Sequence, residues 1–397
     1  MEINSILDPR NIITGVEEKT RKVLPIFFPP LIHAYLNYSH QLSIILAYPE
    51  TYDWFFSNYI QICSSFLENN YMVIHFLPTD REAIENQLYL DVSRVNEDLV
   101  EVGNDIVEKV ISWLDKNYYV GVCLLESEIP GTILHKIGLH HPHTQFLFGY
   151  DRTQKHFNSI NFDSEHNFAM INIGFDTLHK AFFSPVKQKL FAEEYQQWKN
   201  VRYPITLFKF MGECGYRFDI KDIILQLQEY CSGIAPDLKY RSWCVCEDHN
   251  YIRDKDTRWG IRVNDNLGEY FVRIVKNMRK QRMNDPMDKL NREFIPFHGF
   301  WEHKKIMTAR IAFLQNKGFL DPFKKFPEQY YQVEHKANIL RIIVLKYMMK
   351  VNDSSGHDDV AREQEDRHLI QKVWSQLNES QQLEKAILER IVNELIK

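Results

Sequence analysis

The stretch between residues 140 and 163 constrains the fold more than any other part of the chain. An apolar run, a polar turn and a second β-rich run follow one another here and predict an antiparallel hairpin. His143 opens the first predicted strand, and Asn161 and Asp163 end the second. Because a hairpin places the start of one strand beside the end of the next, we expect these side chains at one end of a sheet. A histidine beside an amide or carboxylate is the arrangement of a general base and the group that orients its ring.

The neighbouring segments place this hairpin in a mixed domain. Apolar spacing predicts helices over residues 31–49 and 54–67, and Asp105 with Glu108 resembles a capping box that opens a third helix. The continuous apolar run 119–125 predicts a central strand. Helices first and an antiparallel meander later are typical of an α+β domain, with helices packed on an antiparallel sheet.

The second half of the chain reads differently. Beyond about residue 200, apolar residues recur at helical spacing, as in the segment capped by Asp219, and this predicts an all-α domain. We therefore divide the chain into five parts: an N-terminal arm 1–23, an α+β domain 24–190, a helical domain 191–350, a flexible linker 351–366 and C-terminal amphipathic helices 367–397.

Composition excludes several classes of function. The chain has 48 basic and 53 acidic residues, and no segment combines clustered Lys and Arg with aromatic residues, so we do not expect a nucleic-acid partner. No secretory signal follows Met1, and no apolar run reaches the roughly 20 residues that a membrane span requires. We expect a soluble, cytoplasmic protein without membrane contact. Its six scattered cysteines form no disulfide framework.

Taken in order, these motifs resemble the butirosin-biosynthesis protein H family, distant relatives of papain-like and bacteriocin-leader peptidases. In the helical half, segments 302–307 and 340–347 look like the C-terminal part of family members. The N-terminal match consists of the strand 119–125, the turn Glu126–Pro130, His143 ahead of Phe146–Asp151, Asn161 and the helix 175–183. The resemblance implies a papain-like fold for residues 24–190.

It also implies acyl transfer in bacterial natural-product biosynthesis, on a nonribosomal-peptide or aminoglycoside-like pathway. An acyl or peptidyl group would pass from a carrier-protein thioester to an amine acceptor, with His143 as the general base and Asn161 or Asp163 as its orienting group. The expected partners are the carrier protein and the amine, and a homodimer is left open. No cofactor is expected apart from the phosphopantetheine arm that presents the substrate.

The nucleophile of the papain-like family is missing. A catalytic cysteine belongs at the start of the first core helix, where the helix dipole lowers its pKa. This region contains Ser39, His40 and Ser43 but no cysteine. Three interpretations stay open: a serine nucleophile, acid-base or binding chemistry by His40, or loss of covalent chemistry. Cys63, in a predicted helix interior, and Cys123, in a predicted strand, are interpreted as core residues.

Three further residues are candidates for substrate binding. Glu126 and Glu128 follow the central strand, where they could bind a substrate amine or tune the base, although exposed turn carboxylates explain them equally well. Tyr150, in the motif after His143, is the third.

Three further groups of residues are compared with metal sites and with a docking surface for a carrier protein. His141 and His143 share a strand face, but no third ligand is evident, so no metal is expected. The same holds for Cys244, Cys246 and His249, which lack a second ligand pair. A basic helical face is a possible docking surface for an acidic carrier protein and consists of Arg273, Lys276, Arg279, Lys280 and Arg282.

The sequence therefore favours an acyl or peptidyl transferase, or an amide-forming condensation enzyme. A catalytically degenerate accessory protein that binds a carrier or synthetase is the alternative. A peptide hydrolase is the second alternative and is disfavoured by the missing thiol.

Overall fold

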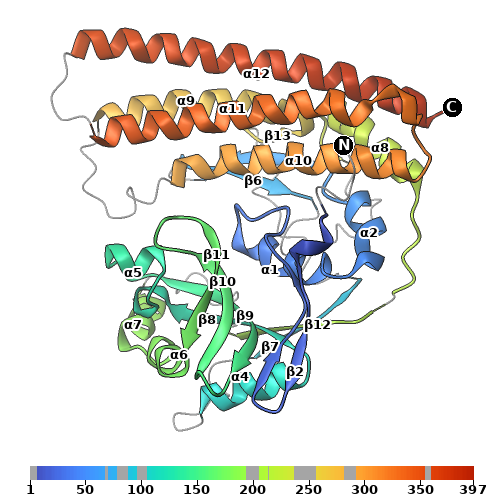
Figure 1. Cartoon of the computed structure of the whole chain (residues 1–397). Coiled ribbons are helices and arrows are strands. Elements are labelled where there is room, and N and C mark those ends of the chain that lie inside the picture. The colour runs from blue at the N-terminus through green and yellow to red at the C-terminus, as the bar shows by residue number, and fades with distance from the viewer. Residues whose placement is uncertain are drawn as a thin grey trace. The chain divides into compact units, whose positions relative to one another are not determined.

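A computed structural model gives the architecture of the chain (Figure 1). It describes residues 7–67, 70–77, 88–95, 105–193, 205–212, 214–236, 256–280, 292–353 and 359–397. The chain forms two compact units. We call Pro9–Thr51 with Gln87–Gly215 the sheet unit, and Met1–Asp8 with Tyr52–Asn86 and Tyr216–Lys397 the helical unit.

The sheet unit is built on antiparallel strands in the order β11-β10-β9-β8-β12-β7, with β3 paired to the far end of β9 and β2 paired to β3. A two-stranded pair, β1 and β4, completes its β structure. The bounds are β1 Ile12–Ile13, β2 Val16–Glu18, β3 Arg21–Val23, β4 Ile26–Phe27, β7 Leu90–Val95, β8 Tyr119–Leu125, β9 Pro142–Asp151, β10 His156–Phe162, β11 Phe168–Gly174 and β12 Ile205–Phe210.

Helices cover both faces of this sheet. On one face, α1 (Leu36–Ile45) packs through His40, whose ring stacks on Phe146 with centroids 5.0 Å apart. On the other face lie α4 (Ile106–Asp115), which contacts β8 and β9, and α6 (Phe175–Phe182), which contacts β8 and β11. Shorter elements complete the unit: η2 (Pro9–Asn11), η3 (Pro49–Thr51), η5 (Glu126–Glu128), α5 (Ile133–Ile137) and α7 (Pro185–Glu193).

The helical unit combines a small antiparallel sheet, β13-β5-β6, with long helices. In Figure 1, α10, α11 and α12 run side by side, and contacts join α10 to α11 and α11 to α12. The bounds are α2 Tyr52–Ser57, β5 Ile62–Phe66, β6 Met72–Phe76, α8 Ile220–Ser232, β13 Arg258–Trp259, η9 Gly260–Arg262, α9 Val263–Lys280, η11 Arg292–Phe294, α10 Ile295–Asn316, η12 Pro322–Lys324, α11 Phe326–Asp353 and α12 Asp359–Leu395.

Buried charges hold the helices of this unit together. Lys304 on α10 donates to both carboxylate oxygens of Glu384 on α12, at 2.9 and 2.8 Å, and the hydroxyls of Tyr230 on α8 and Tyr330 on α11 donate to the same carboxylate. All four side chains are fully buried. Burial lowers the pKa of Lys304, and the charge of Glu384 opposes this shift. The network ties four helices at one point.

A second buried cation closes the end of a short helix. Arg310 on α10 donates to the carbonyl oxygens of Phe56, at 2.8 Å, and Asn58. These carbonyls lie at the C-terminal end of α2, where a helix leaves its last acceptors without intrahelical donors. Burial lowers the pKa of Arg310 to about 9.

The chain is thus a mixed α+β protein with antiparallel sheets and a helical C-terminal region, and several predicted elements differ from the structure. The predicted helix 54–67 is wrong: α2 ends at Ser57, and Ile62–Phe66 form strand β5. Tyr59, at φ 57°, turns the chain between them. Cys63 therefore lies in a buried strand and not in a helix.

The units are also discontinuous in sequence, whereas the predicted division was contiguous. Residues 52–86 belong to the helical unit, and β12, inside the predicted helical domain 191–350, pairs with β7 and β8 in the sheet unit. The predicted arm 1–23 contains β1, β2 and β3. Within the predicted linker 351–366, α11 extends to Asp353 and α12 begins at Asp359, with residues 354–358 outside the described part.

Among the residues that the structure describes, none of the helices combines the length and apolar character that crossing a bilayer requires.

Candidate active site

A histidine and a buried carboxylate form the centre of the candidate site. The Nδ1 atom of His143 lies 2.6 Å from Oε2 of Glu126. The His143 side chain is 37% exposed, whereas that of Glu126 is 2% exposed. Because a carboxylate accepts hydrogen bonds, the neutral imidazole donates from Nδ1–H, and its Nε2 carries the lone pair. This pair has the arrangement of a general base whose ring is oriented by a carboxylate.

Strand pairing explains why these two residues meet. In the register of β8 with β9, Leu124 lies opposite His143 and Leu125 opposite Pro142, so the residue after β8 lies beside the start of β9. The backbone N–H of Glu126 donates to the carbonyl of His141 at 3.1 Å. The η5 turn that begins at Glu126 is held by Thr132, whose hydroxyl donates to the Glu126 carbonyl at 3.3 Å. The backbone thereby fixes the carboxylate beside the ring.

Two buried amides extend the pair into the sheet. Nε2 of Gln145 lies 3.5 Å from the same Glu126 oxygen, and Nδ2 of Asn161 donates to Oε1 of Gln145 at 2.8 Å. Both amide side chains are fully buried, and Oδ1 of Asn161 accepts from the Phe162 N–H at 2.7 Å. A buried polar chain of this kind is stable only when its members satisfy one another, so it restricts the rotamer of Glu126.

The predicted orienting group was therefore misassigned. Asn161 lies in the same cluster as His143, but Gln145 and Glu126 stand between them. Asp163 does not orient the base, because its Oδ1 accepts from the backbone N–H groups of Glu165 and Asn167 at 2.8 and 2.9 Å and so closes the loop after β10. Gln145 was missed, although its position two residues after His143 places both on one strand face.

The candidate nucleophiles do not join this site. His143 and Phe146 lie an odd number of residues apart in an uninterrupted register with β8, so they point to opposite faces of the sheet. Since His40 stacks on Phe146, α1 covers the face opposite to His143. Ser39 and Ser43 on α1 are fully buried, and the Ser39 hydroxyl donates to the carbonyl of Leu36 at 2.9 Å. The charge of His143 nevertheless reaches His40 on this helix, so the expectation that His143 faces the start of the helix across a groove stays a prediction.

His40 provides an acid-sensitive group in the core of the sheet unit. Burial, and then the charge of His143, lowers its pKa from 6.5 to about 3, and its Nε2 has no hydrogen-bond partner. The unfolded chain takes up this proton near pH 6.5 and the folded protein only near pH 3, so stability is lost as the pH falls below 6.5.

We expect the free energy of unfolding of the sheet unit to fall by up to about 1.4 kcal/mol per pH unit below pH 6 from this group. His40→Phe keeps the stacking ring without the titration and should flatten the profile. Urea unfolding at several pH values between 7 and 4 measures the free energy of unfolding of both proteins. Equal slopes in the two proteins would contradict this role.

Two predicted substrate-binding residues have other partners. Glu128, two residues after Glu126, forms an ion pair with Lys180 of α6 at 2.6 Å. Tyr150 lies seven positions from His143 along β9, roughly 23 Å away in an extended strand. Its hydroxyl donates to Asp115 at 2.7 Å, and burial together with this carboxylate raises its pKa to about 12. Tyr150 is therefore not part of the site around His143, whereas Glu126 is at its centre.

The sequence interpretation also missed a polar group beside Glu126. The hydroxyl of Ser127 lies 2.8 Å from Nδ1 of His140, and Nδ1 of His135 lies 2.7 Å from the Ser127 carbonyl. These exposed groups border the site at η5. The rings of His141 and His143 have centroids 6.0 Å apart. Within the described part of the sheet unit, no third ligand converges with these two histidines.

The remaining candidates lie in the helical unit. Arg273 on α9 has its guanidinium over the ring of Phe66, 3.9 Å from the centroid, and Lys276 is exposed. The side chains of Arg279, Lys280 and Arg282 lie outside the described residues, as do Cys244, Cys246 and His249.

No protein-family model matches the chain, and no curated protein matches it significantly.

Proposed function

We propose that the protein is an acyl or peptidyl transferase in which His143 acts as a general base held by Glu126. The observation that carries this proposal is the 2.6 Å contact between a partly exposed imidazole and a buried carboxylate. Such a pair keeps one tautomer and leaves Nε2 to take a proton. A carrier-bound thioester as donor and an amine as acceptor suit this chemistry, because a thioester needs no further activation.

The reaction balances with this one base. The amine nitrogen attacks the thioester carbonyl, His143 Nε2 takes the proton from that nitrogen, and the C–S bond breaks as the amide forms. The imidazolium then returns the proton to the departing thiolate, so the products are an amide and a free thiol. Orienting the two reactants supplies up to roughly 7–11 kcal/mol of the barrier in favourable cases, so a nucleophilic side chain is not required.

We further propose that transfer is direct. Ser39 and Ser43 are buried, and α1 covers the sheet face opposite to His143, which argues against an acyl-serine intermediate on this helix. In this proposal the sheet unit is a papain-like domain that has kept the histidine and lost the nucleophile. Its place would be in bacterial natural-product biosynthesis, with a phosphopantetheine arm presenting the donor.

Direct transfer predicts that the protein mass stays unchanged during turnover. We expect incubation with octanoyl-N-acetylcysteamine to give no covalent adduct, and the double variant Ser39→Ala, Ser43→Ala to keep its rate of hydroxamate formation with hydroxylamine. Intact-protein mass spectrometry and a colorimetric hydroxamate assay measure the two. An adduct of one octanoyl group that disappears in the double variant would contradict direct transfer. Free octanoate in place of hydroxamate would favour a hydrolase.

The burial of Ser39 and Ser43 also supports a second candidate, an accessory protein that binds a carrier or synthetase without catalysis. The two functions differ in their response to His143→Ala. In an accessory protein this variant would leave pathway output unchanged in a reconstituted system. In a transferase it would remove the output while the protein stays folded.

A further inference from the structure

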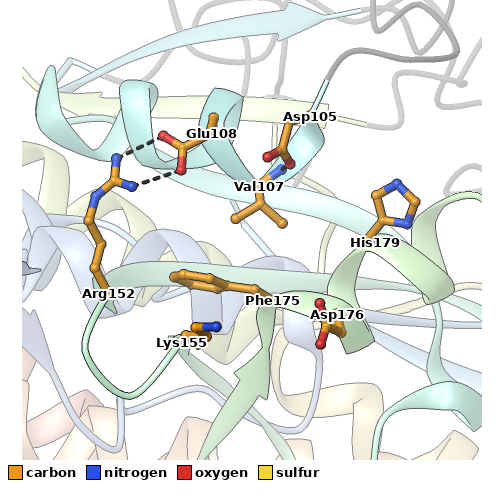
Figure 2. Close-up of a pocket in the computed structure, with 8 residues that line it drawn as sticks. All are labelled: Asp105, Val107, Glu108, Arg152, Lys155, Phe175, Asp176 and His179. Atoms are coloured by element: carbon orange, nitrogen blue, oxygen red, sulfur yellow. Dashed lines mark hydrogen bonds and ion pairs between the residues drawn. The ribbon is translucent and has the colours of Figure 1, made fainter.

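A polar cavity lies in the sheet unit, and none of its lining residues takes part in the chemistry proposed for His143. Its volume is about 670 Å³, within the range of small-molecule sites. It is formed where the first turns of α4 and α6 meet the turn between β9 and β10, and Figure 2 shows its lining residues, Asp105, Val107, Glu108, Arg152, Lys155, Phe175, Asp176 and His179.

The walls of this cavity are fixed by hydrogen bonds. Arg152 donates to both oxygens of Glu108, at 2.7 and 2.8 Å, and so joins the β9–β10 turn to α4. The carbonyl of Lys155 accepts from the Phe175 N–H at 3.0 Å, which joins the same turn to α6. Asp105 caps α4 by accepting from the Val107 N–H at 2.9 Å. Hydrogen bonds between these elements therefore fix the side chains of Arg152, Glu108 and Asp105.

The charges of the lining are separated. Glu108 and Arg152 neutralise each other, while Lys155, Asp105 and Asp176 have no ionic partner among the described residues. In Figure 2, Asp105 and Asp176 lie with His179 on one side, and Val107 and the ring of Phe175 lie between them and Arg152. The cavity thus offers two carboxylates and an imidazole on one side, Arg152 on the other, and Lys155 beside the ring of Phe175.

We propose that this cavity binds a small zwitterion of the amino-acid type that carries an apolar or aromatic side chain. The ligand's ammonium group would lie between Asp105 and Asp176, its carboxylate at Lys155, and its side chain against Phe175 and Val107. Ionised partners make the stronger hydrogen bonds, and an aromatic face favours a neighbouring cation. The two charges of one ligand would match Lys155 and Asp176, which are exposed and have no ionic partner among the described residues, and Asp105, which caps α4.

This site is separate from the one around His143. Its lining residues differ from those around His143, although α6 also reaches η5 through the ion pair of Lys180 with Glu128. The inference therefore does not rest on the proposed transferase function, and its failure would leave that proposal untouched.

Isothermal titration calorimetry with related compounds tests the proposal on the full chain. The probes are L-phenylalanine and L-alanyl-L-phenylalanine, with phenethylamine as the cation-only analogue and 3-phenylpropionate as the anion-only analogue. We expect saturable binding of at least one zwitterion, about tenfold tighter than either analogue. Failure of both zwitterions to bind, or equal binding of all probes, would overturn the proposal.

Two variants assign the charges. Asp176→Asn should weaken binding of the zwitterion about tenfold and leave 3-phenylpropionate unaffected. Lys155→Asn, chosen because Lys155 has φ 55° and asparagine tolerates this conformation, should weaken the zwitterion and leave phenethylamine unaffected. Glu18→Gln, on the exposed part of β2, is the matched control, and circular dichroism checks folding. Zwitterion binding that is indifferent to both cavity variants would contradict the assignment.

Discussion

Replacing His143 with alanine is expected to lower the rate of hydroxamate formation from octanoyl-N-acetylcysteamine and hydroxylamine by roughly a hundred- to ten-thousandfold. The imidazole is the proposed acceptor of the amine proton, and the described residues around it offer no second imidazole held by a buried carboxylate. The loss should appear in kcat more than in KM, because proton transfer belongs to the transition state. The half-exposed position of the ring makes the substitution compatible with folding.

Glu126→Gln separates positioning from proton transfer. The amide keeps the size of the side chain but no longer fixes the Nδ1–H tautomer of His143, so we expect a rate loss of about a hundredfold. His156→Ala, at the opposite end of the hairpin, is the matched control and should keep its rate. A wild-type rate in both His143→Ala and Glu126→Gln would exclude His143 as the base, and a wild-type rate no higher than that without protein would leave the accessory function.

The largest stability effect is expected in the helical unit. Lys304→Met leaves the buried carboxylate of Glu384 without its cation, and breaking such a pair typically costs about 3–5 kcal/mol. Two tyrosine hydroxyls remain as donors to Glu384, but they are neutral. Urea unfolding followed by circular dichroism measures the loss.

A double variant shows whether the loss comes from the unpaired charge. Lys304→Met with Glu384→Gln removes both charges and keeps an acceptor for the tyrosines, so it should be more stable than Lys304→Met alone. Lys350→Met in the exposed pair with Glu365 is the control and should leave stability nearly unchanged. If the double variant were less stable than the single one, the cation would not be the member that satisfies Glu384.

Local sequence patterns were sufficient for much of the sheet unit. The strand 119–125 and the hairpin around Tyr150 were predicted because apolar runs alternate with polar turns, and Asp105 and Asp219 were predicted as helix caps. The segment 62–66 was not, because its first four residues are all buried and a strand without alternation resembles a buried helix. Glu108, predicted to close a capping box, instead pairs with Arg152, 44 residues away.

In the candidate site, too, local sequence patterns identified a residue but not its partners in the fold. His143 was identified because it opens a strand, but its partner depends on the register between β8 and β9, which no local pattern specifies. That register brings Glu126 to the ring and leaves Asn161 behind Gln145. Ser39 and Ser43 were candidates because they lie near the start of a helix. The sheet face on which that helix packs, opposite to His143, is a tertiary property.

The tautomer of His143 tests the central claim most directly. With histidine labelled with ¹⁵N, a long-range proton–nitrogen spectrum at pH 8 distinguishes a protonated Nδ1 from a protonated Nε2, and His143→Ala assigns the signals. We predict that Nδ1 carries the proton, that Nε2 does not, and that Glu126→Gln removes this preference. A proton on Nε2 in the wild-type protein, or a spectrum unchanged by Glu126→Gln, would contradict a base held by this carboxylate.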